Sequence, residues 1–186
     1  MRVSREKAAE NRQRIVETAA RLFRANGFDG VGVDAIMEGA GLTHGGFYGH
    51  FKSKDDLAAE AVSHALTRSN EHQSQFTTLR DLVGDYLSER HRAALADGCA
   101  VAALSGDIVR RDKKVRGGLT AHLRSQIERV TQLLSGGSAA AKRKRAIATM
   151  AGMVGALTLA RAVDDKALAD EILAAARDVF GKDATA

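Results

Sequence analysis

Apolar side chains recur every three or four positions along almost the whole chain, and no stretch alternates apolar and polar residues long enough to make a strand. A spacing of three to four places apolar groups on one face of an α-helix, whereas a half-buried strand needs a period of two. The 186 residues also contain no Pro, which breaks helices when it falls inside them. The pattern therefore predicts an all-α fold and excludes collagenous, disulfide-stapled and disordered classes.

Turn and capping residues divide this pattern into nine expected helices. Gly27, Gly41 and Gly181 stand where helices should end, and Ser53 stands where one should begin. The expected helices cover 5–26, 33–40, 43–51, 54–76, 79–95, 99–110, 113–134, 140–163 and 166–180. A chain of this length buries roughly 70% of its unfolded surface, so its core needs no disulfide or metal.

Three sequence features bear on where the protein is found. Cys99 is the single cysteine and cannot pair within the chain, which favours a reducing compartment. Met1 and Arg2 begin a segment with basic residues but no apolar run, so no signal peptide is predicted. The longest uncharged stretch, 146–160, is shorter than the roughly 20 residues of a transmembrane helix. We therefore expect a cytoplasmic protein with no membrane partner.

Two short helices joined by a turn at Gly41, within 33–51, have the layout of a helix-turn-helix, whose second helix lies in the major groove of DNA. Gly45, Gly46 and Gly49 fall in that second helix. Each costs about 0.5 to 1 kcal/mol relative to Ala in a helix, so stability alone does not select them. They are explained if the backbone closely approaches a phosphate or the edge of a groove.

The same segment carries side chains that can donate hydrogen bonds to phosphates and base edges, namely Thr43, His44, Tyr48, His50, Lys52 and Lys54. The excess of positive charge also lies toward this end, since residues 1–54 hold nine Lys and Arg against six Asp and Glu. From the residues alone two interpretations stay open. One is a DNA-binding helix, and the other is an ordinary solvated helix whose glycines fray.

Residues 27–36, GFDGVGVDAI, and 40–57, AGLTHGGFYGHFKSKDDL, closely resemble the N-terminal domain of the TetR/AcrR family of repressors, over roughly residues 10–60. The resemblance implies a homodimer with a helix-turn-helix DNA-binding domain at 1–53 and an effector-binding and dimerisation domain at 54–186. It also implies the function. That function is a repressor, not an enzyme, that binds a palindromic operator in double-stranded DNA and is released by a small-molecule inducer.

The DNA contacts that the resemblance implies fall on six residues: Thr43, His44 and Gly45 for bases, and Tyr48, His50 and Lys54 for phosphates. Two positions depart from the family's pattern. Gly32 stands where a hydroxyl residue often caps the second helix, and Gly49 stands where a larger residue is common. Fewer side chains can therefore read bases, and specificity should rest more on Thr43, His44 and DNA shape.

Small residues at every fourth position, Ala148, Gly152, Ala156 and Ala160, form a ridge on which another helix can pack closely. Such a ridge indicates tight helix packing, either inside one subunit or across a twofold axis. In the resembling family the last two helices form a dimerising four-helix bundle. The predicted dimer interface is therefore Ala148, Gly152, Ala156, Leu168 and Ile172.

The effector pocket is expected among the helices between residues 79 and 153. Its predicted wall residues are Tyr86, Cys99, Leu104, Leu119, Leu123, Met150 and Met153. Few charges are expected inside, so an apolar or electrophilic small molecule is the favoured effector. Cys99 has two open interpretations, an inert buried thiol and a thiolate sensor activated at a helix start.

Catalytic and metal chemistry find little support in the sequence. The histidines outside the helix-turn-helix, His64, His72, His91 and His122, are scattered without metal-ligand spacing, so neither a metal nor a cofactor is expected. Cys99 assisted by His91 is the one candidate nucleophile and base. The alternative function class is a helical enzyme or small-molecule-binding scaffold that does not use DNA. Such a protein has no use for the three glycines of the helix-turn-helix.

Overall fold

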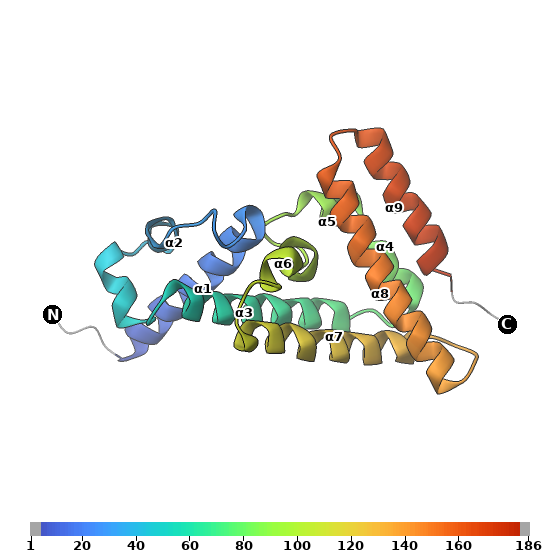
Figure 1. The fold of residues 1–186 in the computed structure, drawn as a ribbon, viewed down its shortest axis with the longest axis horizontal. Coiled ribbons are helices and arrows are strands. Elements are labelled where there is room, and N and C mark those ends of the chain that lie inside the picture. The colour runs from blue at the N-terminus through green and yellow to red at the C-terminus, as the bar shows by residue number, and fades with distance from the viewer. Residues whose placement is uncertain (1–4, 183–186) are drawn as a thin grey trace.

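The computed structural model describes residues 5–182, and every regular element in this range is a helix (Figure 1). The elements are α1 (Arg5–Asn26), α2 (Val33–Gly39), the 3₁₀ helix η1 (His44–Gly49), α3 (Lys54–Ser74), α4 (Leu79–Tyr86), α5 (Glu89–Ala93), α6 (Ala100–Ile108), α7 (Lys113–Leu133), α8 (Ala139–Ala162) and α9 (Lys166–Phe180). The expected all-α fold is confirmed. Within residues 5–182 no helix is long and apolar enough to cross a membrane. Met1 and Arg2, on which the signal-peptide expectation rests, lie outside the described residues.

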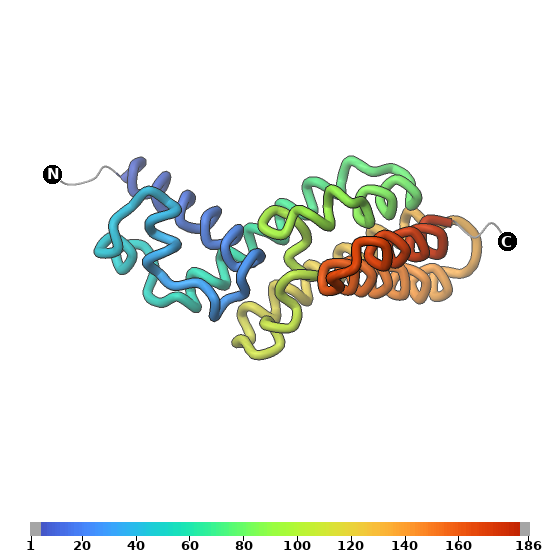
Figure 2. Tube along the Cα trace, turned by 90° about the horizontal axis from the view of Figure 1, so that it is seen from above, coloured from blue at the N-terminus to red at the C-terminus, as the bar shows by residue number. Residues whose placement is uncertain are grey.

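One end of the molecule is a head formed by α1, α2, η1 and the start of α3 (Figures 1 and 2). Its core holds four almost fully buried aromatic rings, Phe23, Phe28, Phe47 and Phe51. The ring centroids of Phe23 and Phe28 are 5.1 Å apart, and those of Phe47 and Phe51 are 5.8 Å apart. Burying one such ring stabilises by about 1.5 to 3 kcal/mol. This packing holds α2 and η1, which are too short to be stable alone.

The body consists of α4 to α9 and the C-terminal part of α3. Helix α3 begins in the head, packs on α1, and continues beside α7 into the body (Figure 1). Helices α8 and α9 form a packed pair at the end opposite the head (Figure 2). Between the two ends, α6 packs on α1, α3 and α8. The predicted division at 53–54 falls at the N-cap of α3, and α3 packs on helices of both parts.

The expected single helix over 79–95 is wrong, because two helices meet at Leu87. The hydroxyl of Ser88 caps α5 by accepting from the His91 N–H at 3.1 Å, and it donates to the Asp85 carbonyl at 2.7 Å. A serine that binds nearby backbone groups in this way competes with continuation of the helix. The apolar periodicity passes through this break, which is why the pattern did not reveal it.

The small-residue ridge of α8 packs inside the chain. A Cβ placed at Gly152 would lie 2.1 Å from Cζ of Phe180 on α9, so only glycine leaves room for that ring. Ala156 and Ala160 are buried within the same chain. Of the two interpretations left open by the sequence, packing within one subunit therefore accounts for most of the ridge.

Candidate functional site

The turn between α2 and η1 is fixed by backbone geometry and by one arginine. Gly41 has a φ of 67°, in the left-handed region that favours glycine. Its N–H donates to the carbonyl of Glu38 at 2.8 Å. The guanidinium of Arg14 on α1 donates to the carbonyl of Ala40. Helix α2, this turn and η1 therefore form a helix-turn-helix held against α1.

The second helix is not the α-helix expected over 43–51, because His44–Gly49 form a 3₁₀ helix. The Gly46 N–H donates to the Thr43 carbonyl at 3.0 Å, and the His50 N–H donates to the Phe47 carbonyl at 2.9 Å, each across three residues. Three glycines weaken the α-helical preference, and a 3₁₀ helix suits so short a segment. Thr43 occupies the N-cap of η1, and among the described residues its side chain makes no capping hydrogen bond.

Helix η1 buries one side and exposes the other. Phe47 is 1% exposed and packs against Phe51, whereas Tyr48 is 70% exposed. The six predicted DNA-contact residues lie on and beside the open side: Thr43, His44, Gly45 and Tyr48 are exposed, and His50 and Lys54 are partly buried. The structure thus brings together all six residues at the outer end of the head.

Internal packing does not require the glycines of this surface. A Cβ placed at Gly45 or Gly49 would meet no atom of the described chain within 4 Å. At Gly46 it would make an ordinary contact, 3.5 Å from Cε of Met37. Gly45, Gly46 and Gly49 are also absent from the glycines that have a positive φ in the described range. Neither packing nor backbone conformation within the chain therefore requires glycine at these three positions. The missing side chains would allow an external phosphate or groove edge to approach the backbone.

An acidic residue that the sequence did not single out faces His44. The carboxylate of Asp34, in the first turn of α2, contacts Nδ1 of the His44 ring. Both side chains are exposed, so the contact orients the imidazole on the surface and leaves Nε2 as its other hydrogen-bonding atom. No local spacing links these two residues, because they lie on different helices.

The start of α3 is anchored to the head by α1. Arg12 donates to both carboxylate oxygens of Glu60, at 2.5 and 2.6 Å, and its guanidinium lies 4.4 Å from the centre of the Phe51 ring. The hydrogen bond from Arg12 lowers the pKa of the Glu60 carboxyl. Ser53 caps α3 by accepting from a backbone N–H at 3.1 Å. These contacts fix the position of Lys54 relative to η1.

A second candidate site lies in the body as two adjoining cavities. The outer cavity has a volume of about 680 Å³ and is lined by α1, α3, α4, α5 and the loop 94–99. The inner cavity has a volume of about 30 Å³ and is lined by α3, α4, α6, α7 and α8. Four residues line both cavities: Gln73, Leu82, Tyr86 and Cys99.

Five of the seven predicted pocket residues border these cavities. Tyr86 and Cys99 line both, whereas Leu123, Met150 and Met153 line the inner one. Leu104 is buried in the core and Leu119 packs partly buried against it, and neither borders the described cavities. The expectation of few charges fits the inner cavity. The outer cavity differs, since arginines, histidines and carboxylates line it, some of them from the head helix α1.

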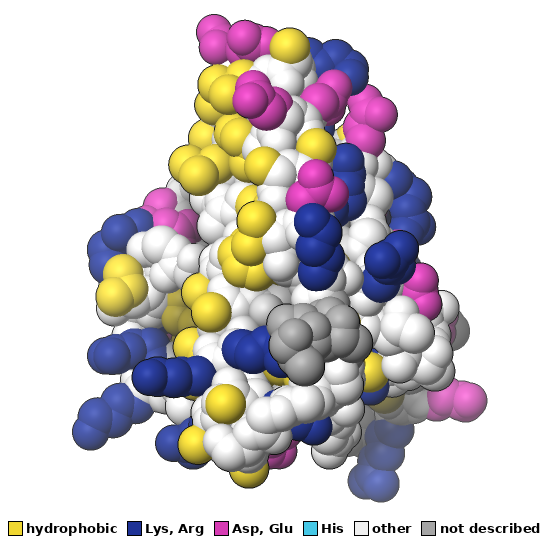
Figure 3. All heavy atoms as spheres, turned by 90° about the vertical axis from the view of Figure 1, so that its right-hand side faces the viewer, with side chains coloured by type: hydrophobic (Ala, Val, Ile, Leu, Met, Phe, Trp, Pro, Cys, Tyr) yellow, Lys and Arg dark blue, Asp and Glu magenta, His cyan; other side chains and the backbone are white. Residues whose placement is uncertain are grey.

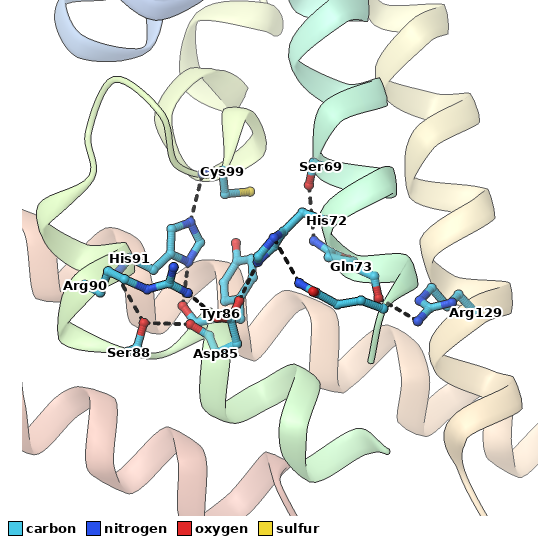
Figure 4. Close-up of polar contacts among 11 residues, drawn as sticks. Ser69, His72, Gln73, Asp85, Tyr86, Ser88, Arg90, His91, Cys99 and Arg129 are labelled. Carbon is cyan, nitrogen blue, oxygen red and sulfur yellow. Dashed lines mark hydrogen bonds and ion pairs between the residues drawn. The ribbon is translucent and has the colours of Figure 1, made fainter. Parts of the chain in front are cut away.

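His91 is held between two backbone groups at the wall of the outer cavity (Figure 4). Its Nδ1 lies 2.6 Å from the Tyr86 carbonyl, which can only accept, so Nδ1 carries the proton. Its Nε2 accepts from the Cys99 N–H at 2.9 Å. Burial lowers the pKa of His91, which favours this neutral form. With both nitrogens engaged, His91 is not placed to take a proton from the Cys99 thiol.

The described residues also show no metal site, since no group of three or more His, Cys, Asp or Glu is placed to hold an ion. Cys99 is buried at the N-cap of α6, near His91 and Tyr86 (Figure 4), and it is among the residues that line both cavities. Its two interpretations, inert thiol and sensor, both remain compatible with this position.

The N-terminal part of the chain matches known regulators in sequence. Residues 15–61 match the family described as "Bacterial regulatory proteins, tetR family". The HTH-type transcriptional regulator AcrR of Shigella flexneri is 36% identical over 87 residues, which is 47% of this chain and 40% of that protein. The HTH-type transcriptional regulator SAB2452 of Staphylococcus aureus is 36% identical over 85 residues, which is 46% of this chain and 43% of that protein. The match spans less than half the length of these curated relatives.

Solved structures extend the likeness to the fold of the whole chain. A TetR-family transcriptional regulator from Cytophaga hutchinsonii superposes with a TM-score of 0.79 at 19% identity, over 100% of both chains. A TetR transcriptional regulator from Chloroflexus aurantiacus superposes with a TM-score of 0.75 at 26% identity, over 95% of this chain and 94% of that one. The body as well as the head therefore shares its helical arrangement with these proteins.

Proposed function

The chain belongs to the TetR/AcrR family of bacterial regulatory proteins, and from this premise we propose that it regulates transcription by binding operator DNA. The full proposal is a cytoplasmic homodimeric repressor that occupies a palindromic operator and leaves it when a small molecule binds. Residues 1–53 would bind DNA, and residues 54–186 would bind the effector and form the dimer. The proposal assigns the protein no enzymatic activity and no cofactor.

The observation that carries the DNA-binding proposal is the open side of η1. Gly45 and Gly49 leave bare backbone on this surface, although nothing inside the chain needs the space. Beside it stand Thr43 and His44, which would read base edges. Tyr48 is 70% exposed, so its ring contributes little to the core. A phosphate contact by its hydroxyl would account for an aromatic side chain at this exposed position. With His50 and Lys54, these residues would position the head on duplex DNA.

Dimerisation is proposed through the outer faces of α8 and α9. On α9, Leu168 is 43% and Val179 67% exposed, and the partly buried Ile172 lies between them at helical spacing. On α8, Ile147 and Leu159 are exposed. Figure 3 shows hydrophobic side chains gathered along the face of this end of the molecule. Apolar stripes on two neighbouring helices suit a four-helix bundle with a second copy of the chain.

The predicted interface residues divide into two groups under this proposal. Ala148 and Leu168 are exposed and Ile172 is partly exposed, so these can touch a partner directly. Gly152 and Ala156 instead pack within the chain, where Gly152 makes room for Phe180. They would shape the interface indirectly, by holding α8 against α9.

Release of DNA on effector binding requires a structural connection between the cavities and the head. Helix α6 and the loop that precedes it provide contacts to the head at both ends. At the cavity end, Nε of Arg24 on α1 donates to the Ala96 carbonyl at 2.5 Å. At the other end, the Asp107 carboxylate accepts from the Phe28 N–H of the head at 3.4 Å. A ligand that displaces this loop or α6 would therefore turn the head. A hundredfold loss of DNA affinity needs about 2.7 kcal/mol of such coupling.

Sequencing of the random DNA duplexes that the purified protein retains tests this proposal. We expect enrichment of a pseudo-palindrome with half-sites about 10 bp apart or a multiple of that spacing. A parallel selection with His44→Ala should change the preference at one base pair per half-site, by about 1 to 3 kcal/mol. Retention of duplexes without any sequence in common would refute a specific operator.

A further inference from the structure

The two body cavities are neighbours, because Gln73, Leu82, Tyr86 and Cys99 belong to the walls of both. The outer part, of about 680 Å³, has the size of a small-molecule site. The inner part, of about 30 Å³, has room for a group the size of one or two water molecules. A ligand that fills the outer cavity therefore contacts side chains that also line the inner cavity.

The inner cavity is uncharged but contains two buried polar atoms in need of a partner. The described residues of its wall include no Lys, Arg, Asp or Glu. Nδ1 of His122 is buried and has no hydrogen-bond partner within the described chain, and the buried Tyr86 hydroxyl has no nitrogen or oxygen partner there, with only the weakly bonding Cys99 thiol beside it. Unsatisfied buried polar atoms are rare, because each has lost its hydrogen bonds to water. A ligand group in the inner cavity that hydrogen-bonds to these atoms would restore what burial has removed.

That ligand group should be uncharged. Burial lowers the pKa of His122, so its ring is neutral near pH 7. Burial, and then the neighbouring Cys99 thiol, raise the pKa of Tyr86, so its hydroxyl keeps its proton and can donate. A charged group would lose its hydration here without meeting an opposite charge. An oxygen that both donates and accepts, as in a hydroxyl, fits these neighbours.

The outer cavity has the opposite character, because cations exceed anions on its wall. It is lined by Arg21, Arg24, Arg68 and Arg90 and three histidines, against the carboxylates of Glu17, Asp85 and Asp97. Both aspartates already have basic partners: Asp85 contacts Arg90 and lies 2.8 Å from His72, and Asp97 lies 3.0 Å from Arg21. Arg68 pairs with Glu71 at 3.2 Å, and Arg24 shares Asp97 with Arg21. Each guanidinium has five N–H donors, and these ion pairs use only some of them, so the wall arginines can still bind the carboxylate of a ligand.

Aromatic rings belong to the wall of the outer cavity. The rings of Tyr86 and His91 meet edge to face with centroids 4.8 Å apart, as Figure 4 shows, and those of His72 and Phe76 do so at 5.6 Å. Rings in such a wall offer faces and edges to a further flat ring. They favour an aromatic over an aliphatic core for the ligand.

We propose that this site binds an amphipathic aromatic acid, whose ring hydroxyl enters the inner cavity between Tyr86 and His122 and whose carboxylate lies among the outer arginines. Arg21 and Arg24 of the outer wall belong to the head helix α1, so a ligand bound there contacts the head directly. That this contact controls DNA binding rests on the proposed function. Binding is non-covalent and needs no reaction at Cys99. The proposal therefore narrows the effector class expected from the sequence.

Three matched probes test the ligand class by isothermal titration calorimetry on the full chain without DNA. Phloretate carries a ring hydroxyl and a carboxylate, hydrocinnamate lacks the hydroxyl, and tyramine replaces the carboxylate by an ammonium group. We expect phloretate to bind about tenfold more tightly than hydrocinnamate, the effect of one or two buried hydrogen bonds. Tyramine should bind more weakly still, because it places a cation among arginines.

Variants assign the two ends of the ligand. Tyr86→Phe keeps the ring, and it should weaken phloretate about tenfold while leaving hydrocinnamate unchanged. The double variant Arg68→Gln, Arg90→Gln should weaken both acids. Arg143→Gln, an exposed position in the first turns of α8 away from the cavities, is the matched control and should change neither. The melting temperature of Tyr86→Phe reports folding, and it should change little, since the lost hydroxyl has no nitrogen or oxygen partner in the described chain and only the weakly bonding Cys99 thiol beside it.

Three results would each overturn the proposal. These are equal affinity for tyramine and phloretate, an unchanged phloretate affinity in Tyr86→Phe, and no binding of any probe at millimolar concentration. DNA retention is measured separately on the same samples. Phloretate binding with DNA still retained would uphold the ligand class and contradict the inducer role. DNA binding without phloretate binding would uphold the proposed function and contradict the ligand class.

Discussion

Replacing Gly45 by Ala separates a role in folding from a role in binding. The added Cβ would meet no atom of the described chain within 4 Å, and the position needs no left-handed φ. Glycine costs about 0.5 to 1 kcal/mol relative to Ala in a helix, so Gly45→Ala should stabilise the free protein by up to that amount. For a chain of this size the melting temperature should rise by about 1 to 4 °C.

DNA affinity should move in the opposite direction. If the backbone at Gly45 touches a phosphate or groove edge, a methyl group there separates the surfaces, and we expect at least about a tenfold loss of affinity by fluorescence anisotropy. Gly84→Ala on α4 is the matched control, since its Cβ would also meet no described atom within 4 Å. It should stabilise similarly and leave DNA binding intact. Full DNA affinity in a stabilised Gly45→Ala protein would refute the close approach of DNA to η1.

Three further predictions test the head, the dimer and the buried histidine. Lys54→Ala should flatten the log–log salt dependence of DNA binding by about one unit, whereas Lys142→Ala in the body should not. Leu168→Glu should weaken dimerisation by at least about thirtyfold in sedimentation without unfolding the subunit, because this side chain is already 43% exposed. Burial lowers the pKa of His122, so protonation opposes folding and stability is lost as pH falls below about 6.5. The melting temperature of His122→Gln should therefore depend less on pH between about pH 7 and pH 5.5, and an equal dependence would contradict this.

The long helices could be predicted from the sequence because their apolar periodicity and caps agree. α9 was expected at 166–180 and has those bounds, and α7 and α8 differ from expectation only at their ends. Apolar periodicity does not predict the bounds and type of the short elements, because local hydrogen bonds determine them. At Ser88 a hydroxyl ends one helix and caps the next, and in η1 the glycines shift the bonding from four residues to three. The spacing of apolar residues is nearly the same before and after the break at Ser88, and it differs little between a 3₁₀ helix and an α-helix as short as η1.

The two candidate sites differ in how far the sequence reveals them, for a physical reason. The proposed DNA-contact surface lies in one short segment. Gly45 and Gly49 lower the helix propensity of that segment, and packing within the chain does not require them, so the sequence alone marks the segment as unusual. A cavity is a volume left between helices distant in sequence. Tyr86 borders it and Leu104 does not, yet both are buried at helical spacing, so periodicity cannot distinguish them. The charge of the outer wall comes partly from Arg24 of the head, and the packing of α1 against the loop 94–99 brings that arginine into the same cavity wall as Tyr86. The chemistry of a ligand thus depends on contacts between the head and the body that no single segment encodes.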